Sequence, residues 1–164
     1  SRELYQTRVK YNLKNGKDFY MVGGMGHSSM VTLGLSIHNN KQAICLDGDG
    51  SVLMHMGALT NIGRLGKKNY KNIVLNNFAH ESVGGQKTFS EHFNFNLLSK
   101  SLGYKRYFYL KDKKNIKKII KKFLKSNGPC LMEVKIKQGA MKNLLRPKNL
   151  IQIKEKFINN KRFK

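Results

Sequence analysis

Apolar runs of strand length alternate with helix-length segments along this chain, and this alternation constrains its fold more than any other feature. The apolar runs fall at residues 18–22, 42–46, 72–75, 106–110 and 130–136. Segments with helical character lie between them, one ending near residue 38 and others at 51–64, 91–102 and 113–125. Such alternation is typical of a mostly parallel sheet with helices on both faces, so we predict an α/β, doubly wound fold.

The segment 113–125 shows the clearest helical periodicity. Its apolar side chains recur at positions i, i+3, i+4, i+7 and i+8: Ile116, Ile119, Ile120, Phe123 and Leu124. Lysines fill the positions between them. The pattern predicts an amphipathic helix with one face packed on the sheet and a solvated basic face.

The net charge suggests a second class of function. The 164 residues hold 32 Lys and Arg against 9 Asp and Glu, a formal net charge of +23, which favours a nucleic-acid-binding module. Residues 104–164 hold 20 basic and 3 acidic residues, so +17 lies in the last part of the chain. Only 6 of the basic residues are Arg, which binds nucleobases and phosphates better than Lys does. We therefore consider nucleic acid an unlikely partner and keep this module as an alternative.

Apolar runs and cysteines indicate the cellular setting. No apolar run approaches the roughly 20 residues of a membrane span, so we expect a soluble, cytoplasmic protein without a membrane partner. Cys45 and Cys130 both lie inside apolar runs. We predict that they are buried free thiols.

Three strand-to-helix junctions are the places to look for a ligand, because open parallel sheets bind ligands outside the carboxyl ends of their strands. The first junction, at 23–29, is rich in glycine and lets a backbone approach a ligand closely. The second places Asp47 and Asp49 after an apolar run, and the third places Asn77 28 residues after Asp49. Carboxylate, amide and carbonyl oxygens suit a magnesium ion that carries a diphosphate, although a carboxylate at a helix start can also be a simple cap.

The spacing of GDGS and NN resembles that of the diphosphate-binding domain of thiamine-diphosphate-dependent enzymes. Several blocks carry the resemblance: SREL at the start, DFYMVGGMGHSS, CLDGDGSVLMHMGAL, VLNNFAHESVGGQKT, and LLRPKNL followed by KEKFI. Within that family the blocks are most similar to the phosphonopyruvate decarboxylases, and the sulfopyruvate decarboxylases are the nearest relatives. Two positions differ from the usual pattern: Lys87 replaces a proline, and LLRP replaces LGRP.

The resemblance implies thiamine diphosphate and Mg²⁺ as cofactors. It assigns the metal to the side chains of Asp49 and Asn77 and to the carbonyl of Ala79. The residues it assigns to the organic cofactor are Gly23, Met25, Gly48, Asp49, Gly50, Ser51 and Asn77. In this assignment the carbonyl of Gly23 accepts from the 4′-amino group, and Met25 supports the bent cofactor.

The resemblance also implies a reaction, the decarboxylation of phosphonopyruvate to phosphonoacetaldehyde and carbon dioxide. The candidate catalytic residues are His80, His27, Glu81, Ser82 and Gln86, which would donate to the anionic groups of the substrate or move a proton. His55 is interpreted as a packed helix residue. Sulfopyruvate or another 2-keto acid remains an alternative substrate.

The same resemblance implies that this chain is half of an enzyme. We expect residues 1–164 to form a single diphosphate-binding domain. The activating glutamate would come from a pyrimidine-binding domain or subunit that this chain lacks. The chain begins at Ser1, and we expect either part of a longer decarboxylase or one of two subunits. We therefore expect a homo- or hetero-oligomer, and no activity from residues 1–164 alone.

Overall fold

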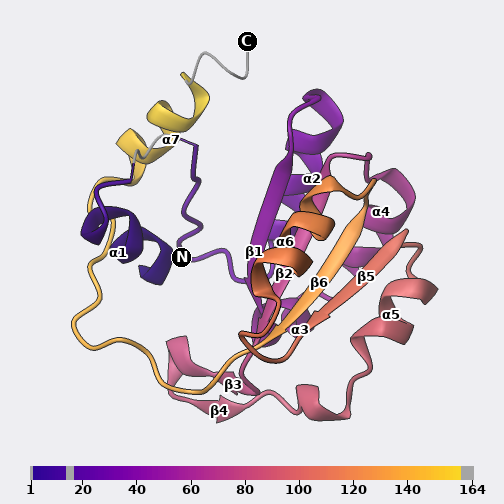
Figure 1. Cartoon of the computed structure of the whole chain (residues 1–164). Coiled ribbons are helices and arrows are strands. Elements are labelled where there is room, and N and C mark those ends of the chain that lie inside the picture. Colours follow the sequence, from indigo (N-terminus) through magenta and orange to yellow (C-terminus); the bar gives the residue numbers. More distant parts are fainter. Residues whose placement is uncertain (1, 14–16, 160–164) are drawn as a thin grey trace. The chain divides into compact units, whose positions relative to one another are not determined.

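The computed structural model describes residues 2–13 and 17–159 (Figure 1). The chain divides into two compact units, which are described separately. One unit comprises residues 1–23 with 140–164, and the other comprises residues 24–139. That residues 1–164 form one diphosphate-binding domain stays a prediction.

A four-stranded parallel sheet forms the centre of the unit 24–139. Its strands are β1 (Ala43–Gly48), β2 (Tyr70–Asn76), β5 (Arg106–Leu110) and β6 (Cys130–Lys135), in the order β1-β2-β6-β5. All three strand pairs are parallel. Four of the five predicted apolar runs therefore become strands, with their bounds shifted by a few residues at most.

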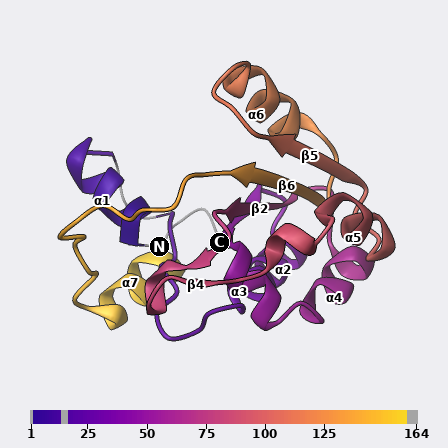
Figure 2. The same ribbon diagram turned by 90° about the horizontal axis from the view of Figure 1, so that it is seen from below.

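Helices cover both faces of the sheet (Figure 2). On one face lie α2 (Ser28–His38), α3 (Asp49–Met54), α4 (Ala58–Leu65) and α5 (Phe95–Ser101), and on the other lies α6 (Ile116–Lys125). Strand β6 separates two cores, since Leu131 packs with the first group of helices and its neighbours Cys130 and Met132 pack with Phe123 of α6. The predicted α/β fold with helices on both faces is confirmed.

Helix α6 has the amphipathic character that its sequence predicts. Phe123 is completely buried, while Ile119, Ile120 and Leu124 are partly buried against the sheet. The lysines of the helix are exposed. The helix begins at Ile116 rather than at Lys113, and it ends at Lys125 as predicted.

Two predicted helices are interrupted. The segment 51–64 divides into α3 and α4, because His55 leaves the helical region (φ −134°, ψ 42°) and Gly57 starts the second helix. A glycine inside a helix is costly and favours such a break. The segment 91–102 divides into a 3₁₀ turn, η2 (Ser90–His92), and α5, whose N-cap Asn94 accepts hydrogen bonds from two backbone amides.

The predicted strand at 18–22 is wrong. In the unit 1–23 with 140–164, this segment lies beside α1 (Arg2–Lys10), and Asp18 pairs with Arg8 at 2.7 Å. The rings of Tyr20 and Tyr5 meet edge to face at 5.4 Å, and Phe19 contacts Phe157 of α7 (Leu150–Ile158) at the same distance. The apolar residues therefore pack against helices, and apolar content alone does not distinguish that arrangement from a strand.

The remaining elements form a small hairpin after β2. Strands β3 (Ala79–His80) and β4 (Gln86–Lys87) pair antiparallel around a 3₁₀ turn, η1 (Glu81–Val83). Cys45 and Cys130 are buried and free, as predicted. Within residues 2–13 and 17–159, no helix has the length and apolar character needed to cross a membrane.

Candidate functional site

Asp49 lies at the carboxyl edge of the sheet, where β1 passes directly into α3. Gly48 is the last residue of β1 and pairs in register with Leu75 of the adjacent β2. Because β1 and β2 are parallel neighbours, Asp49 and the pair Asn76 and Asn77 leave the sheet at the same edge. The convergence predicted from the 28-residue spacing is therefore present.

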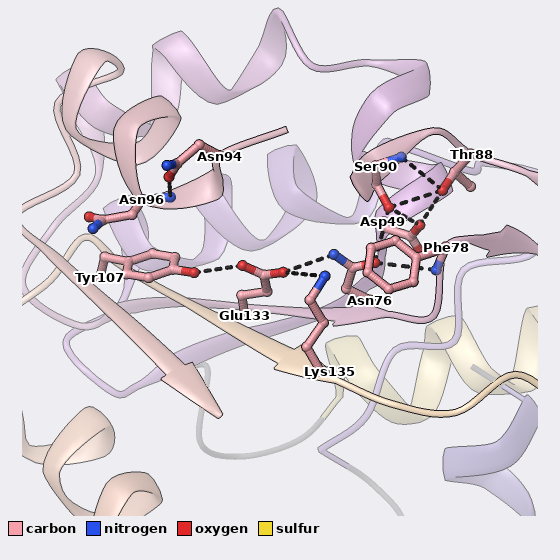
Figure 3. A network of polar contacts seen from close by, with 10 residues as sticks. All are labelled: Asp49, Asn76, Phe78, Thr88, Ser90, Asn94, Asn96, Tyr107, Glu133 and Lys135. Atoms are coloured by element: carbon pink, nitrogen blue, oxygen red, sulfur yellow. Dashed lines mark hydrogen bonds and ion pairs between the residues drawn. The ribbon is translucent and has the colours of Figure 1, made fainter. Parts of the chain in front are cut away.

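The Asp49 carboxylate is almost completely buried, with 1% of the residue exposed. Its Oδ2 atom accepts hydrogen bonds from the hydroxyls of Thr88 (2.5 Å) and Ser90 (2.8 Å), as Figure 3 shows. Among the described residues, nothing donates to Oδ1, and no cationic side chain forms an ion pair with Asp49. A buried carboxylate without a counter-charge is unfavourable, so this position suits a bound cation.

Asn77 and Ala79 turn the chain from β2 into the hairpin. The Asn77 side-chain oxygen accepts from the Ala79 amide at 3.2 Å, and Phe78 between them adopts a left-handed conformation (φ 62°). Gln138 donates to the Asn77 carbonyl at 3.1 Å. Together with Asp49 this turn supplies carboxylate, amide and carbonyl oxygens, the ligands that Mg²⁺ prefers. The residues present thus fit a magnesium ion.

At Gly50 the start of α3 comes into direct contact with the hairpin that carries His80. A Cβ atom at this position would lie 2.3 Å from Nδ1 of His80 and 3.1 Å from Cγ2 of Thr88. The hairpin therefore packs directly on the start of α3, with the His80 ring against the glycine. Only a residue without a side chain leaves room for this contact.

The first glycine-rich junction contacts α3 from another side. The Gly26 amide donates to the Ser51 hydroxyl at 2.8 Å, and a Cβ at Gly26 (φ 89°) would lie 2.5 Å from the His55 ring. Met25 is half-buried in the same turn. Gly23 (φ 74°) belongs to the other unit. The roles of Gly23, Met25 and Ser51 toward a cofactor stay predictions.

His27 and His55 lie side by side, with ring centroids 4.1 Å apart. Both residues are exposed. The interpretation of His55 as a packed helix residue is therefore wrong: α3 ends at Met54, and this end frees the His55 ring to stack on His27. No spacing rule in the sequence signals this pair.

The other candidate catalytic residues lie on the hairpin that carries His80. Glu81 accepts a hydrogen bond from the Gly139 amide, while Ser82 and Gln86 are exposed. Of the five candidates, the structure thus brings His80 against Gly50 and leaves Ser82 and Gln86 at the surface of the hairpin.

Asp47 forms a second carboxylate near the start of α3. It accepts from the Ser28 hydroxyl at 2.9 Å and is 7% exposed. Burial raises the pKa of this carboxyl, and hydrogen bonds from Ser51 and Ser28 oppose that rise. Because Asp47 already binds Ser28 and its neighbouring Gly48 amide, it supports the junction between β1 and α2.

A polar network extends from Asp49 to β6 (Figure 3). The Ser90 hydroxyl lies 3.0 Å from Oδ1 of Asn76, whose amide donates to Glu133 at 2.8 Å. Glu133 also accepts from the Tyr107 hydroxyl (2.6 Å) and pairs with Lys135 (3.1 Å). Burial, followed by the bond to Glu133, raises the pKa of Tyr107.

Sequence reasoning missed several members of this network. The sequence signals Asn76 only as the first half of the NN pair, and no motif or spacing points to Thr88, Ser90 or Glu133. Glu133 and Lys135 also line a cleft of about 330 Å³ beside η2. Thr88 and Ser90 reach Asp49 because the chain that follows the hairpin folds back onto α3, which local spacing does not encode.

Comparison with known proteins identifies the family. Residues 4–134 match the family described as the C-terminal TPP binding domain of thiamine pyrophosphate enzymes. TPP, thiamine pyrophosphate, is another name for thiamine diphosphate. The chain belongs to this family, in agreement with the predicted resemblance.

The chain is also similar to named decarboxylases. It is 34% identical over 148 residues to phosphonopyruvate decarboxylase of Streptomyces viridochromogenes, a match that covers 90% of this chain and 36% of that protein. It is 30% identical over 139 residues to sulfopyruvate decarboxylase subunit beta of Methanothermobacter thermautotrophicus, covering 85% of this chain and 70% of that subunit. The chain thus spans about a third of the length of the phosphonopyruvate decarboxylase that it matches.

A solved structure supports the fold independently. A Mycobacterium smegmatis protein assigned to the thiamin diphosphate-dependent enzymes superimposes with a TM-score of 0.56 at 18% identity. The match covers 71% of this chain and 23% of that protein. At this identity the likeness shows the fold alone.

Proposed function

We propose that this chain is the diphosphate-binding part of a thiamine-diphosphate- and Mg²⁺-dependent 2-keto acid decarboxylase. The observation that carries the proposal is the convergence of Asp49 and Asn77 at the carboxyl edge of two adjacent parallel strands. Membership of the TPP-binding family supports thiamine diphosphate as the organic cofactor. The buried Asp49 carboxylate, which has no ion-pair partner among the described residues, and the oxygen ligands around it support the metal.

In this proposal the side chains of Asp49 and Asn77 and the carbonyl of Ala79 hold Mg²⁺. The backbone of Gly50 and Ser51 binds the diphosphate, and Gly48 keeps the preceding turn narrow. Gly23 and Met25 contact the thiamine portion. Bound thiamine diphosphate supplies the carbon nucleophile and the electron sink that loss of carbon dioxide from a 2-keto acid requires.

The substrate that we propose is phosphonopyruvate, with phosphonoacetaldehyde and carbon dioxide as products. Its carboxylate and phosphonate require donors near the reacting carbon. His80 packs on Gly50 and so lies beside the proposed diphosphate position, where its imidazole can donate or move a proton. His27, Glu81, Ser82 and Gln86 are the further candidates for binding or orienting the anionic groups.

Sulfopyruvate is a second candidate substrate. Three relatives named sulfopyruvate decarboxylase subunit beta, at 30–41% identity, favour it. Their names also support an assembly of more than one subunit. We propose that a separate pyrimidine-binding domain or subunit in this assembly supplies the activating glutamate. Both substrates carry an acidic group next to the keto acid, so the same donors would serve either one.

The test is a decarboxylation assay on the complete enzyme, in which this chain is combined with its pyrimidine-binding domain or subunit. Release of carbon dioxide is measured from phosphonopyruvate and from sulfopyruvate, with and without Mg²⁺ and thiamine diphosphate. We expect dependence on both cofactors and a preference for phosphonopyruvate. Preference for sulfopyruvate would favour the second candidate.

Two variants test the metal ligand. Replacing Asp49 with Ala should lower activity about 100-fold or more, because loss even of an outer ligand contact costs about 10- to 100-fold. Asp112→Ala, on an exposed loop residue, is the matched control and should leave activity unchanged. Wild-type activity in Asp49→Ala would contradict the proposed site. Activity from residues 1–164 alone would contradict the need for a second domain.

A further inference from the structure

Two hydroxyls hold one oxygen of Asp49 and leave the other open. Thr88 and Ser90 both reach Oδ2, at 2.5 and 2.8 Å, and all three residues are at least nine-tenths buried. Hydrogen bonds from hydroxyls to a carboxylate are charge-assisted and short, so they fix the orientation of the acceptor. The carboxylate is thus held with Oδ1 free of hydrogen bonds within the described residues.

The orientation of each hydroxyl follows from its other contacts. The Thr88 hydroxyl accepts from the Ser90 amide at 3.4 Å, and its one proton has two acceptors in reach, Asp49 Oδ2 at 2.5 Å and the Ser90 oxygen at 3.0 Å. The Ser90 hydroxyl has one proton and two acceptors, Asp49 Oδ2 and Asn76 Oδ1. The carboxylate carries the charge and is the stronger acceptor.

Glu133 fixes the orientation of the Asn76 side-chain amide. A carboxylate only accepts, so Asn76 must direct its NH₂ group to Glu133 and its oxygen to Ser90. Tyr107 and Lys135 hold Glu133 in turn. The orientation of Asn76 beside Ser90 is therefore fixed by side chains from β5 and β6 (Figure 3), and its oxygen accepts from the Phe78 amide at 3.3 Å.

We propose that Thr88 and Ser90 are positioning residues that make Asp49 a one-oxygen ligand and so give the cation site its preference for Mg²⁺ over Ca²⁺. This inference rests on the proposed function. Mg²⁺ requires compact octahedral coordination, whereas Ca²⁺ accepts more ligands and often binds both oxygens of a carboxylate. With Oδ2 occupied by two hydroxyl protons, only Oδ1 is available to a cation.

The experiment measures cation affinity rather than activity. The complete enzyme with thiamine diphosphate is loaded with Mn²⁺, and displacement of bound Mn²⁺ by Mg²⁺ or Ca²⁺ is followed by electron paramagnetic resonance. Thr88→Val and Ser90→Ala each remove one hydroxyl. We expect a 10- to 100-fold loss of Mg²⁺ affinity and a smaller loss of Ca²⁺ affinity, as is typical of groups that orient a metal ligand.

Two further variants separate positioning from folding. Thr88→Ser retains the hydroxyl and should retain most of the preference for Mg²⁺. Thr60→Val removes an exposed hydroxyl on α4 that bonds the Gly57 carbonyl and belongs to no part of the network around Asp49, and it should leave both affinities unchanged. The thermal midpoint without cation is recorded for each variant. If Ser90→Ala does not fold, the Mg²⁺ and Ca²⁺ affinities of the nearly isosteric Thr88→Val variant decide whether the inference holds.

Three results would overturn the inference. These are unchanged affinities in both variants, equal losses for Mg²⁺ and Ca²⁺, and a Thr88→Ser variant as poor as Thr88→Val. An enzyme that decarboxylates its substrate and binds Mn²⁺, but shows one of these results, contradicts only this inference. A wild-type enzyme that binds no Mn²⁺ contradicts the proposed function itself.

Discussion

The imidazole of His80 lies so close to Gly50 that a Cβ on the glycine would stand 2.3 Å from its Nδ1 atom. Gly50→Ala must therefore displace the His80 ring, or the hairpin that carries it, from the start of α3. We expect a loss of about 1–3 kcal/mol in the free energy of unfolding, typical of an overpacked contact. Affinity for thiamine diphosphate should fall as well. Urea denaturation and calorimetric titration measure the two effects.

Gly34→Ala is the control for this variant. Gly34 lies within α2 with nothing inside 4 Å of the added Cβ, so alanine should stabilise the helix by about 0.5–1 kcal/mol. An alanine at Gly50 as harmless as the one at Gly34 would show that His80 does not pack where it is described.

The ring centroids of His55 and His27 lie 4.1 Å apart. Because His27 is a proposed substrate-binding residue, we predict that His55 contributes to activity by holding the His27 ring in place. Ring contacts of this kind contribute about 1 kcal/mol, so His55→Ala should lower kcat/KM about fivefold by releasing His27. His55→Phe retains a ring and should retain activity. His38→Ala, an exposed histidine at the end of α2, is the control. Equal activity of the Ala and Phe variants would contradict the prediction.

The strands and the proposed metal ligands could be predicted from the sequence for a local reason. Apolar runs of four to seven residues between turn signals mark buried strands, and four of the five runs form the sheet. Asp49 and Asn77 directly follow two of those strands. Any parallel pairing of β1 with β2 brings them to one edge, so their meeting required no knowledge of side-chain packing.

The missed residues depend on long-range packing. Thr88 and Ser90 lie 39 and 41 residues from Asp49 and reach it because the hairpin folds back over α3. The run at 18–22 satisfies the pattern of a buried strand, yet its rings pack against helices. Lys71 resembles the many solvated lysines of this chain but is completely buried. None of these outcomes is encoded by spacing.

Lys71 is predicted to stabilise the junction between β2 and the end of α6. Its Nζ donates to the Ser126 carbonyl at 2.6 Å and to the Lys68 carbonyl at 3.2 Å, and burial lowers its pKa. Lys71→Met retains the aliphatic chain but leaves both carbonyls without this donor. We expect a loss of about 2 kcal/mol, the value typical of a buried hydrogen bond to a charged group.

Urea denaturation measures this loss, with Lys118→Met as the control. Lys118 is exposed on α6, so its replacement should change stability by less than about 0.5 kcal/mol. Similar stabilities of the two variants would show that Lys71 acts as an ordinary surface lysine.

Cys45 predicts how stability changes at alkaline pH. Burial raises the pKa of its thiol from 9.0 to about 12 in the folded protein. Between these values the folded state retains a proton that the unfolded state has lost, so the stability present below pH 9 decreases as the pH rises. The loss amounts to about 1.4 kcal/mol between pH 8 and pH 10, since one unit of pKa corresponds to about 1.4 kcal/mol.

The comparison that isolates this thiol is the slope of stability against pH. Cys45→Ala should lose less stability than the wild type between pH 8 and pH 10, whatever its stability at pH 8. Val52→Ala, which also truncates a buried side chain but removes no titrating group, should retain the wild-type slope. Urea denaturation at pH 8, 9 and 10 gives the three slopes. Identical slopes for Cys45→Ala and the wild type would mean that the Cys45 thiol titrates alike in both states, as an exposed cysteine would.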